Sequence, residues 1–132
     1  MSIRLQDLFQ WAKGQHSTET GRRAAVSRAY YAGYHKCIEW EQTLPQTGNP
    51  LGQNGSTHGG SHQKLINRLQ QPSPNCSAAQ QVLSEQLGNL LEAVRALRHR
   101  ADYDLTATIT LANVAQAISD VQMILVKAVR TP

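Results

Sequence analysis

The sequence predicts an all-α fold, an up-and-down bundle of four to five helices in a single domain over residues 1–132. Apolar residues recur at steps of three and four along several segments, which is the spacing of one helix face. Aromatic residues make up only 5% of the chain. The core must therefore rest on Leu, Ile, Val and Ala, a mixture that suits helices better than a β-sandwich.

The first two helices are expected over residues 3–13 and 17–42. In the short first helix the apolar residues share one stripe, and Gly14 follows as a stop signal. The long second helix has Ser17 as its expected N-cap and is apolar on two sides, which is typical of a helix at the centre of a bundle or between two subunits. Its two stripes are Ala24, Ser27, Tyr31, Tyr34 and Ile38, and Val26, Tyr30, Gly33, Cys37 and Trp40.

Small residues in the second helix predict a close contact with another helix. Ala25, Ala29, Ala32 and Gly33 leave room for a neighbouring backbone. Together with the second apolar stripe, they favour a homodimer.

Residues 43–60 predict a long mobile loop, because they include two Pro, five Gly and two Asn and offer little from which to build a core. A short helix is expected over residues 62–71, with Ser61 as its cap. Pro72 and Pro74 then end it.

Two long helices are expected over residues 78–100 and 110–129, separated by a polar corner at residues 101–108. Ser77 and Gln80 match a capping box at the start of the first. Each helix carries apolar residues at alternating steps of four and three, as in the seam of a helix bundle. The seam residues are Leu83, Leu87, Leu90, Val94 and Leu97 in one helix, and Leu111, Val114, Ile118, Val121, Leu125 and Ala128 in the other.

The composition sets broad limits on function. A net charge of +4 and a pI of about 9.4 permit contact with RNA, DNA or an acidic protein but do not require it. No apolar run reaches the length of a signal peptide or a membrane span, so a cytoplasmic protein without a membrane partner is expected. Cys37 and Cys76 are expected to be free thiols. The His and Cys residues lack the spacing of metal ligands, so neither a metal nor another cofactor is expected.

The densest polar segment lies at residues 95–104. Arg95, Arg98 and His99 can share one helix face, because they are spaced three and four residues apart. The planar guanidinium of Arg suits phosphate, and His transfers protons near neutral pH. The segment could therefore hold and cleave RNA. In a purely structural alternative, the cations complement the helix dipole, and Asp102 and Asp104 pair with the arginines.

A second candidate combines Arg28 with Tyr30, Tyr31 and Tyr34. Arg beside aromatic rings can form a nucleic-acid surface. The helical spacing of the tyrosines instead favours core positions with their hydroxyl groups at the edge. In that case Arg28 is expected to reach a carboxylate in another helix.

Two segments resemble motifs of HEPN-domain proteins. Residues 27–35 (SRAYYAGYH) are similar to the SRxYYAxxH helix of that family, and residues 98–103 (RHRADY) are similar to the R…ADY corner of a subset of it. Residues 60–62 (GSH), which open a short helix, fit the same subset. The resemblance spans residues 17–128.

The resemblance implies a helical bundle that dimerises, with both polar corners near the dimer seam. Many members of the family are metal-independent RNases, often toxins that pair with a nucleotidyltransferase antitoxin. They use an Arg to stabilise phosphate and a His, separated from it by four to six residues, to transfer a proton. Arg98 matches the Arg, whereas the matching positions for the His hold Tyr103, Asp104 and Leu105.

Three functions follow as hypotheses. The first is a metal-independent RNase of a toxin–antitoxin or defence system. There Arg98 holds the phosphate together with Arg95 and Arg28, His99 or Asp102 moves protons, and Tyr103 donates a hydrogen bond. The second is a non-catalytic dimeric HEPN module that binds a partner protein, a nucleotide or RNA. The third is a structural helical bundle.

Overall fold

The fold is an all-α bundle, as the sequence predicts. The computed structural model describes residues 18–51 and 60–129. These residues form α2 (Glu19–Glu41), α3 (Ser61–Gln70), α4 (Ala78–Tyr103) and α5 (Leu111–Lys127), and no strand occurs among them. The helix predicted over residues 3–13, the expected N-cap Ser17 and loop residues 52–59 lie outside the described ranges.

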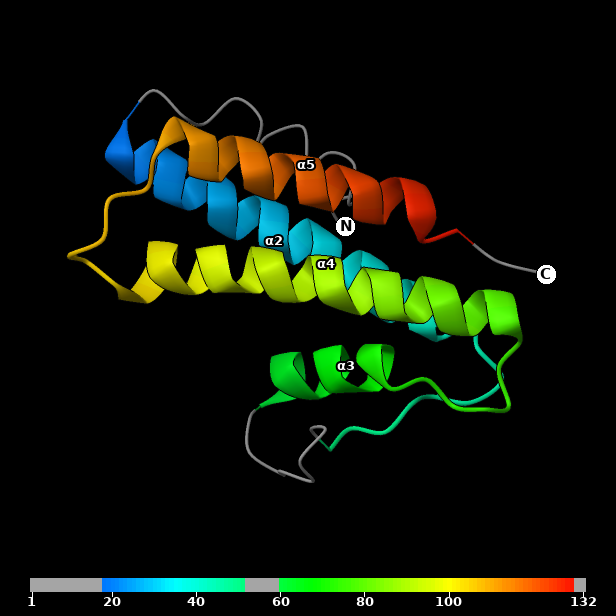
Figure 1. Cartoon of the computed structure of the whole chain (residues 1–132). Coiled ribbons are helices and arrows are strands. Elements are labelled where there is room, and N and C mark those ends of the chain that lie inside the picture. Colours follow the sequence, from blue (N-terminus) through cyan, green and yellow to red (C-terminus); the bar gives the residue numbers. More distant parts are fainter. Residues whose placement is uncertain (1–17, 52–59, 130–132) are drawn as a thin grey trace, which may run out of the picture.

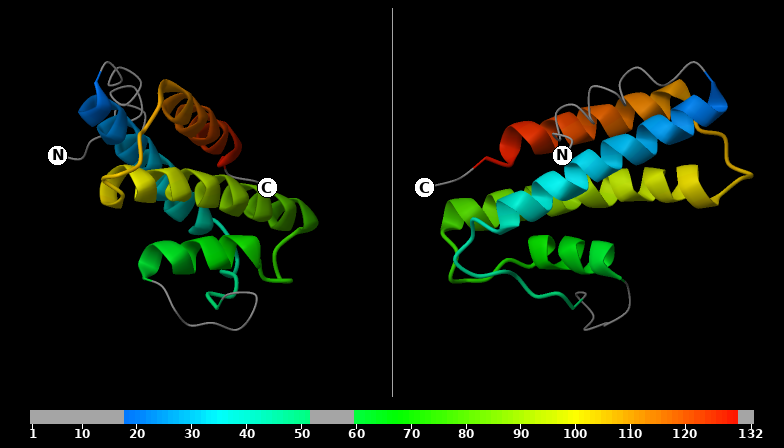
Figure 2. Two further views of the ribbon diagram at one scale, coloured as in Figure 1. Left: turned by 60° about the vertical axis from the view of Figure 1, so that its left-hand side comes forward. Right: turned by 180° about the vertical axis from the view of Figure 1, so that it is seen from behind.

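The three long helices, α2, α4 and α5, alternate in direction, and each packs against the other two (Figure 1). The shorter α3 runs antiparallel to α4 and lies on the side of α4 away from α5 (Figure 2). This arrangement brings the first turn of α3 beside the second half of α4, where Arg95 contacts Gln63.

Both predicted stripes of α2 take part in the bundle, but to different degrees. Every residue in the stripe from Val26 to Trp40 is buried, whereas Tyr31, Tyr34 and Ile38 of the other stripe are half-buried. The predicted seams of α4 and α5 mostly face the core. The exception is Leu111, which is 60% exposed. Side chains of α4 and α5 with no exposed surface are Leu87, Leu91, Val94, Ala117, Val121 and Ile124.

The small residues of α2 make their close contact inside the bundle. Ala29 and Ala32 are fully buried, and a Cβ added at Gly33 would lie 3.3 Å from Cδ1 of Ile124 and 3.4 Å from Cγ2 of Val121. Gly33 therefore lets α5 approach α2, and because the chain itself buries all these positions, no second subunit is needed to explain them.

Local sequence signals set most of the helix starts. The Ser77–Gln80 capping box at α4 is confirmed: Ser77 Oγ accepts from the Gln80 amide at 3.1 Å, and Gln80 Oε1 accepts from the Ser77 amide at 2.8 Å. Thr18 caps α2. The prediction that Ser61 caps α3 is wrong, because Ser61 is the first helical residue and Gly60 occupies the cap position without a side-chain bond.

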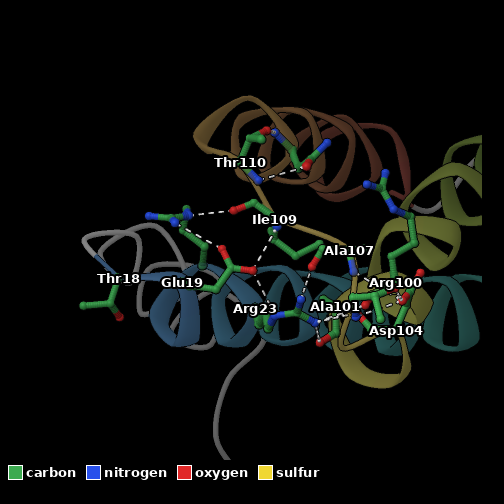
Figure 3. A network of polar contacts seen from close by, with 12 residues as sticks. Thr18, Glu19, Arg23, Arg100, Ala101, Asp104, Ala107, Ile109 and Thr110 are labelled. Atoms are coloured by element: carbon green, nitrogen blue, oxygen red, sulfur yellow. Dashed lines mark hydrogen bonds and ion pairs between the residues drawn. The ribbon is translucent and has the colours of Figure 1, made fainter.

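The end of α4 differs from the prediction. The helix continues to Tyr103, so residues 101–103 belong to it rather than to a polar corner. Figure 3 shows the reason: the guanidinium of Arg23, from α2, donates to the carbonyl oxygens of Arg100, Ala101, Asp104 and Ala107. A side chain far away in the sequence therefore donates to carbonyl groups at and after the helix end, including that of Ala101, where the helix has run out of backbone donors.

The same network fixes the start of α2 against the segment before α5. Glu19 accepts from Arg22, Arg23 and the amide of Ile109, and Arg22 donates to the Ile109 carbonyl at 2.6 Å (Figure 3). The hydrogen bond from Ile109 is the main cause that lowers the pKa of Glu19. Arg22 and Arg23 thus hold the fold together.

The described part of the 43–60 segment is anchored, in contrast to the mobile loop that its composition predicts. The amide of Asn49 donates to the Gln71 carbonyl at 3.0 Å, and the side chain of Asn67 donates to the Pro50 carbonyl at 2.9 Å. Arg68 of α3 also pairs with buried Glu41 at the end of α2, at 2.7 Å. These bonds fix α3 relative to α2.

None of the helices among the described residues combines the length and the apolar character that crossing a membrane requires.

Candidate functional site

Arg98, near the end of α4, packs against α2, with its side chain only 12% exposed. Its Nε atom is 2.7 Å from Oδ2 of Asp102, and its Nη2 donates to the hydroxyl of Tyr31 at 3.1 Å. The guanidinium carbon is 5.4–5.5 Å from the ring centres of Tyr30, Tyr31 and Tyr103. Arg98 is therefore held by charge, hydrogen bonding and cation–π contact together.

Asp102 balances the charge of Arg98 from one helical turn further along α4. Its Oδ2 also accepts from the Ser27 hydroxyl of α2 at 3.3 Å, which accounts for a polar side chain buried in that helix. The predicted pairing of Asp102 with an arginine is confirmed. Asp104 instead accepts from Thr106 and the Ala107 amide, and its hydrogen bonds to Thr106 are the main cause that lowers its pKa.

His62, in the first turn of α3, faces the same group of tyrosines. Its Nδ1 lies 2.6 Å from the hydroxyl of Tyr30, which is fully buried. Its ring stacks on Tyr34 with the centres 4.1 Å apart and an angle of 13° between the planes. The residue is half-buried, so part of the imidazole stays open to solvent.

Both the burial and the charges around His62 favour its neutral form. Burial, then the positive charges of Arg98 and Arg95, and then His35 lower the pKa of the imidazole. Burial also raises the pKa of Tyr30 well above its usual value, so that the phenol keeps its proton. At neutral pH the pair is an uncharged imidazole hydrogen-bonded to an uncharged phenol.

Arg95 lies beside the tyrosines and His62, on the side of α4 that faces α3. Its Nη1 donates to Oε1 of Gln63 at 2.6 Å. Its Nε is buried and finds no hydrogen-bond partner among the described residues. An unpaired guanidinium nitrogen is costly to bury. We call the seven residues together the tyrosine–arginine cluster: Tyr30, Tyr31, Tyr34, His62, Arg95, Arg98 and Asp102.

His99 lies apart from the Arg98–Asp102 pair. Consecutive residues on a helix point about 100° apart, and His99 is exposed, with its ring 4.9 Å from that of Tyr103. Together with Glu92, Arg95 and Arg100 it lines a shallow, open depression of about 420 Å³ on α4. Only Arg95 belongs both to this depression and to the cluster.

The structure therefore joins some of the predicted site residues and separates others. Arg95, Arg98 and Asp102 come together, Tyr103 contacts Arg98 from the exposed side, and His99 points elsewhere. Arg28 is exposed on α2. The expectation that the tyrosines are core residues is confirmed for Tyr30, whereas Tyr31 and Tyr34 are half-buried at the edge of the core.

Sequence reasoning did not assign His62 and Gln63 to the site. The available signal was the position of His62 at the start of a helix, in the GSH segment that resembles the HEPN subset. Its spacing from Tyr30, 32 residues away, gave no indication of contact.

No family model, curated protein or solved structure matches this chain. Within residues 18–51 and 60–129, no three His, Cys, Asp or Glu side chains gather in a way that could hold a metal ion. Cys37 and Cys76 are both buried and free, and burial raises the pKa of Cys37 to about 12.

Proposed function

We propose that the protein is a HEPN-like module that binds RNA, with the tyrosine–arginine cluster as its phosphate-binding site. The observation that carries the proposal is the meeting of two arginines and a neutral histidine in one half-buried cluster. Guanidinium groups suit phosphate oxygens, and the half-buried rings of Tyr31 and Tyr34 offer faces on which a base can stack. The positive net charge supports the same partner.

Binding fits this geometry better than cleavage, because Asp102 already balances Arg98 and His99 lies away from the pair. The partner would be RNA rather than a protein surface, since the cluster combines cations with flat aromatic rings.

A metal-independent RNase is the second candidate, and one specific observation favours it. His62 is neutral, because its pKa is lowered, and it lies close to two cations. A neutral imidazole can accept a proton at neutral pH, and the cations would stabilise charge on the phosphate. In that case the protein would be a toxin or defence effector, with a nucleotidyltransferase-type antitoxin as its partner.

A single assay separates the two candidates. Fluorescent RNA is mixed with wild type, Arg95→Ala and Lys127→Ala in EDTA, and anisotropy and a denaturing gel are read from the same samples. Lys127 is the control, since its replacement removes the same charge at the end of α5. A binding module holds intact RNA and loses about tenfold or more in affinity with Arg95→Ala only. An RNase shortens the RNA. No binding and no cleavage by wild type would reject both candidates.

We also propose that the protein is a homodimer, as the resemblance to HEPN proteins implies. The small residues of α2 no longer support a dimer, because the chain itself buries them, with Gly33 against α5. Light scattering at micromolar concentration should give about twice the 14.6 kDa chain mass. A monomer at that concentration would exclude a site shared between two subunits.

A further inference from the structure

We propose that His62 is a ligand of the bound phosphate, and that Tyr30 prepares it for that role by fixing the proton on Nε2. This inference rests on the proposed binding of RNA and names a contact residue at the same site. The chemical class of ligand is a phosphate oxygen of an RNA strand.

The first step concerns the proton of Tyr30. The phenol is fully buried, and burial opposes its ionisation, so it keeps its hydrogen. A buried O–H needs an acceptor. Among the described residues the one hydrogen-bond partner of this hydroxyl is Nδ1 of His62, at 2.6 Å. Tyr30 therefore donates, and Nδ1 accepts.

The second step concerns the other ring nitrogen. A neutral imidazole carries one hydrogen, so an Nδ1 atom that accepts a bond leaves that hydrogen on Nε2. The alternative, a doubly protonated ring, is disfavoured by burial and by the charges of Arg98 and Arg95. His62 thus presents an N–H donor at Nε2.

The third step concerns the ligand that the Nε2–H donor can bind. The described residues offer no hydrogen-bond partner to Nε2, since the single hydrogen bond of the ring is at Nδ1. Stacking on Tyr34 and the bond to Tyr30 hold the ring in one orientation. Arg95, which donates to Gln63 in the first turn of α3, places its positive charge beside His62. A free N–H donor at Nε2 beside the positive charges of Arg98 and Arg95 fits an oxygen anion.

The same assignment distinguishes a binding site from a cleaving one. A histidine that accepts a proton from a ribose hydroxyl at Nε2 must carry its own hydrogen on Nδ1, and Tyr30 would then have to accept rather than donate. The position of one proton therefore decides between the two candidate functions.

The position of the proton can be measured directly. Two-bond ¹H–¹⁵N correlation spectra of the full chain at pH 7.5 report which ring nitrogen carries the hydrogen, and a His62→Phe variant identifies the signals. We expect a neutral ring with its proton on Nε2 in wild type. Tyr30→Phe keeps the buried ring but lacks the hydroxyl, and should give a mixture of both tautomers. A wild-type His62 ring with its proton on Nδ1, or with two protons, overturns the proposal, whether or not the protein binds RNA.

Binding provides the second measurement. His62→Phe keeps an aromatic ring against Tyr34 without a donor, and His62→Gln restores a side-chain N–H. RNA affinity should fall about tenfold with Phe, and recover at least in part with Gln. Thermal midpoints check that both variants fold. The probes are a single-stranded RNA 12-mer, a mononucleotide and inorganic phosphate, and the 12-mer should bind most tightly because several phosphates contribute.

The outcomes separate this inference from the proposed function. If His62→Phe binds the RNA 12-mer like wild type while Arg95→Ala does not, the protein binds RNA but His62 is not a ligand. If wild type binds none of the three probes, the proposed function fails, and the phosphate contact of His62 fails with it. If the mononucleotide binds as tightly as the 12-mer, the ligand is a free nucleotide rather than an RNA strand.

Discussion

The Nε atom of Arg98 lies 2.7 Å from Oδ2 of Asp102, so the arginine that resembles a phosphate-handling residue already has a carboxylate as its partner. The pair is a charge contact rather than a well-aligned hydrogen bond, since this buried Nε lacks a hydrogen-bond partner within the described ranges. The charge that Arg98 can offer to a phosphate therefore depends on Asp102.

Removing the charge of Asp102 should strengthen RNA binding. In Asp102→Asn the guanidinium loses its balancing carboxylate, and affinity at low salt should rise about twofold to fivefold, the size of one partly exposed ion pair. Anisotropy titrations at two salt concentrations measure the change. Glu85→Gln is the matched control, because Glu85 is exposed on the same helix. A loss of affinity in Asp102→Asn would mean that the carboxylate serves to hold Arg98 in place.

Arg98→Ala should lower the free energy of unfolding by about 1–3 kcal/mol, because Asp102 loses its cation and the Tyr31 hydroxyl loses its donor. This loss is smaller than the total stability of an ordinary domain, about 5–15 kcal/mol, so the variant should still fold. Urea unfolding measures it. Arg100→Ala, at an exposed position two residues away, should change stability by less than about 0.5 kcal/mol. Equal effects from the two variants would show that the Arg98 contacts contribute nothing.

Arg23→Ala should destabilise the protein by about 2–4 kcal/mol, because four carbonyl groups at and after the end of α4 lose one charged donor. Arg23→Lys should recover only part of the loss, since an ammonium group cannot spread its donors as a guanidinium does. Lys64→Ala, at an exposed position on α3, serves as the control in the same urea titration. Full rescue by Lys would argue that charge alone matters at the helix end.

Two buried glycines should respond differently to alanine. At Gly88 a Cβ would lie 2.8 Å from Cγ of Gln70 and 3.1 Å from its amide nitrogen, so α3 would have to move away from α4. Gly88→Ala should cost about 1–3 kcal/mol by overpacking. At Gly33 the nearest atoms are methyl groups of Ile124 and Val121, at 3.3 and 3.4 Å, with no backbone atom near, and the gain in helix propensity, up to about 1 kcal/mol, should offset the contact. Thermal unfolding compares the two, and a greater loss at Gly33 would contradict the packing described for α5.

Stability should fall between pH 7.5 and pH 5 through His62. The pKa of His62 is lowered in the folded protein, so the unfolded chain, with its ordinary value of about 6.5, binds more protons below that pH. The contribution of His62 to the free energy of unfolding is fully present above about pH 6.5, and it is lost as the pH falls through the lower pKa that His62 has in the folded protein. The thermal midpoint of His62→Gln should therefore depend less on pH than that of wild type. A His62→Gln slope equal to that of wild type would contradict this assignment.

The sequence by itself determined the helices and much of the core. The capping box at Ser77 and Gln80 and the Leu and Val seams depend on residues three or four apart, and such spacing acts through local helix geometry. The pairing of Arg98 with Asp102 lies within the same reach, at i and i+4, and it was one of the two alternatives that the sequence left open.

Only the tertiary structure decided where α4 ends and which histidine joins the arginines. Arg23 and the carbonyl of Ala101 are 78 residues apart, and Tyr30 and His62 are 32 apart. Contacts at such separations depend on how whole helices pack, and no local spacing encodes them. His99 follows Arg98 in the chain yet points away from it, because a helix turns about 100° per residue. His62 reaches the cluster because α3 packs antiparallel along α4, with its first turn directed at Arg95 and the tyrosines of α2.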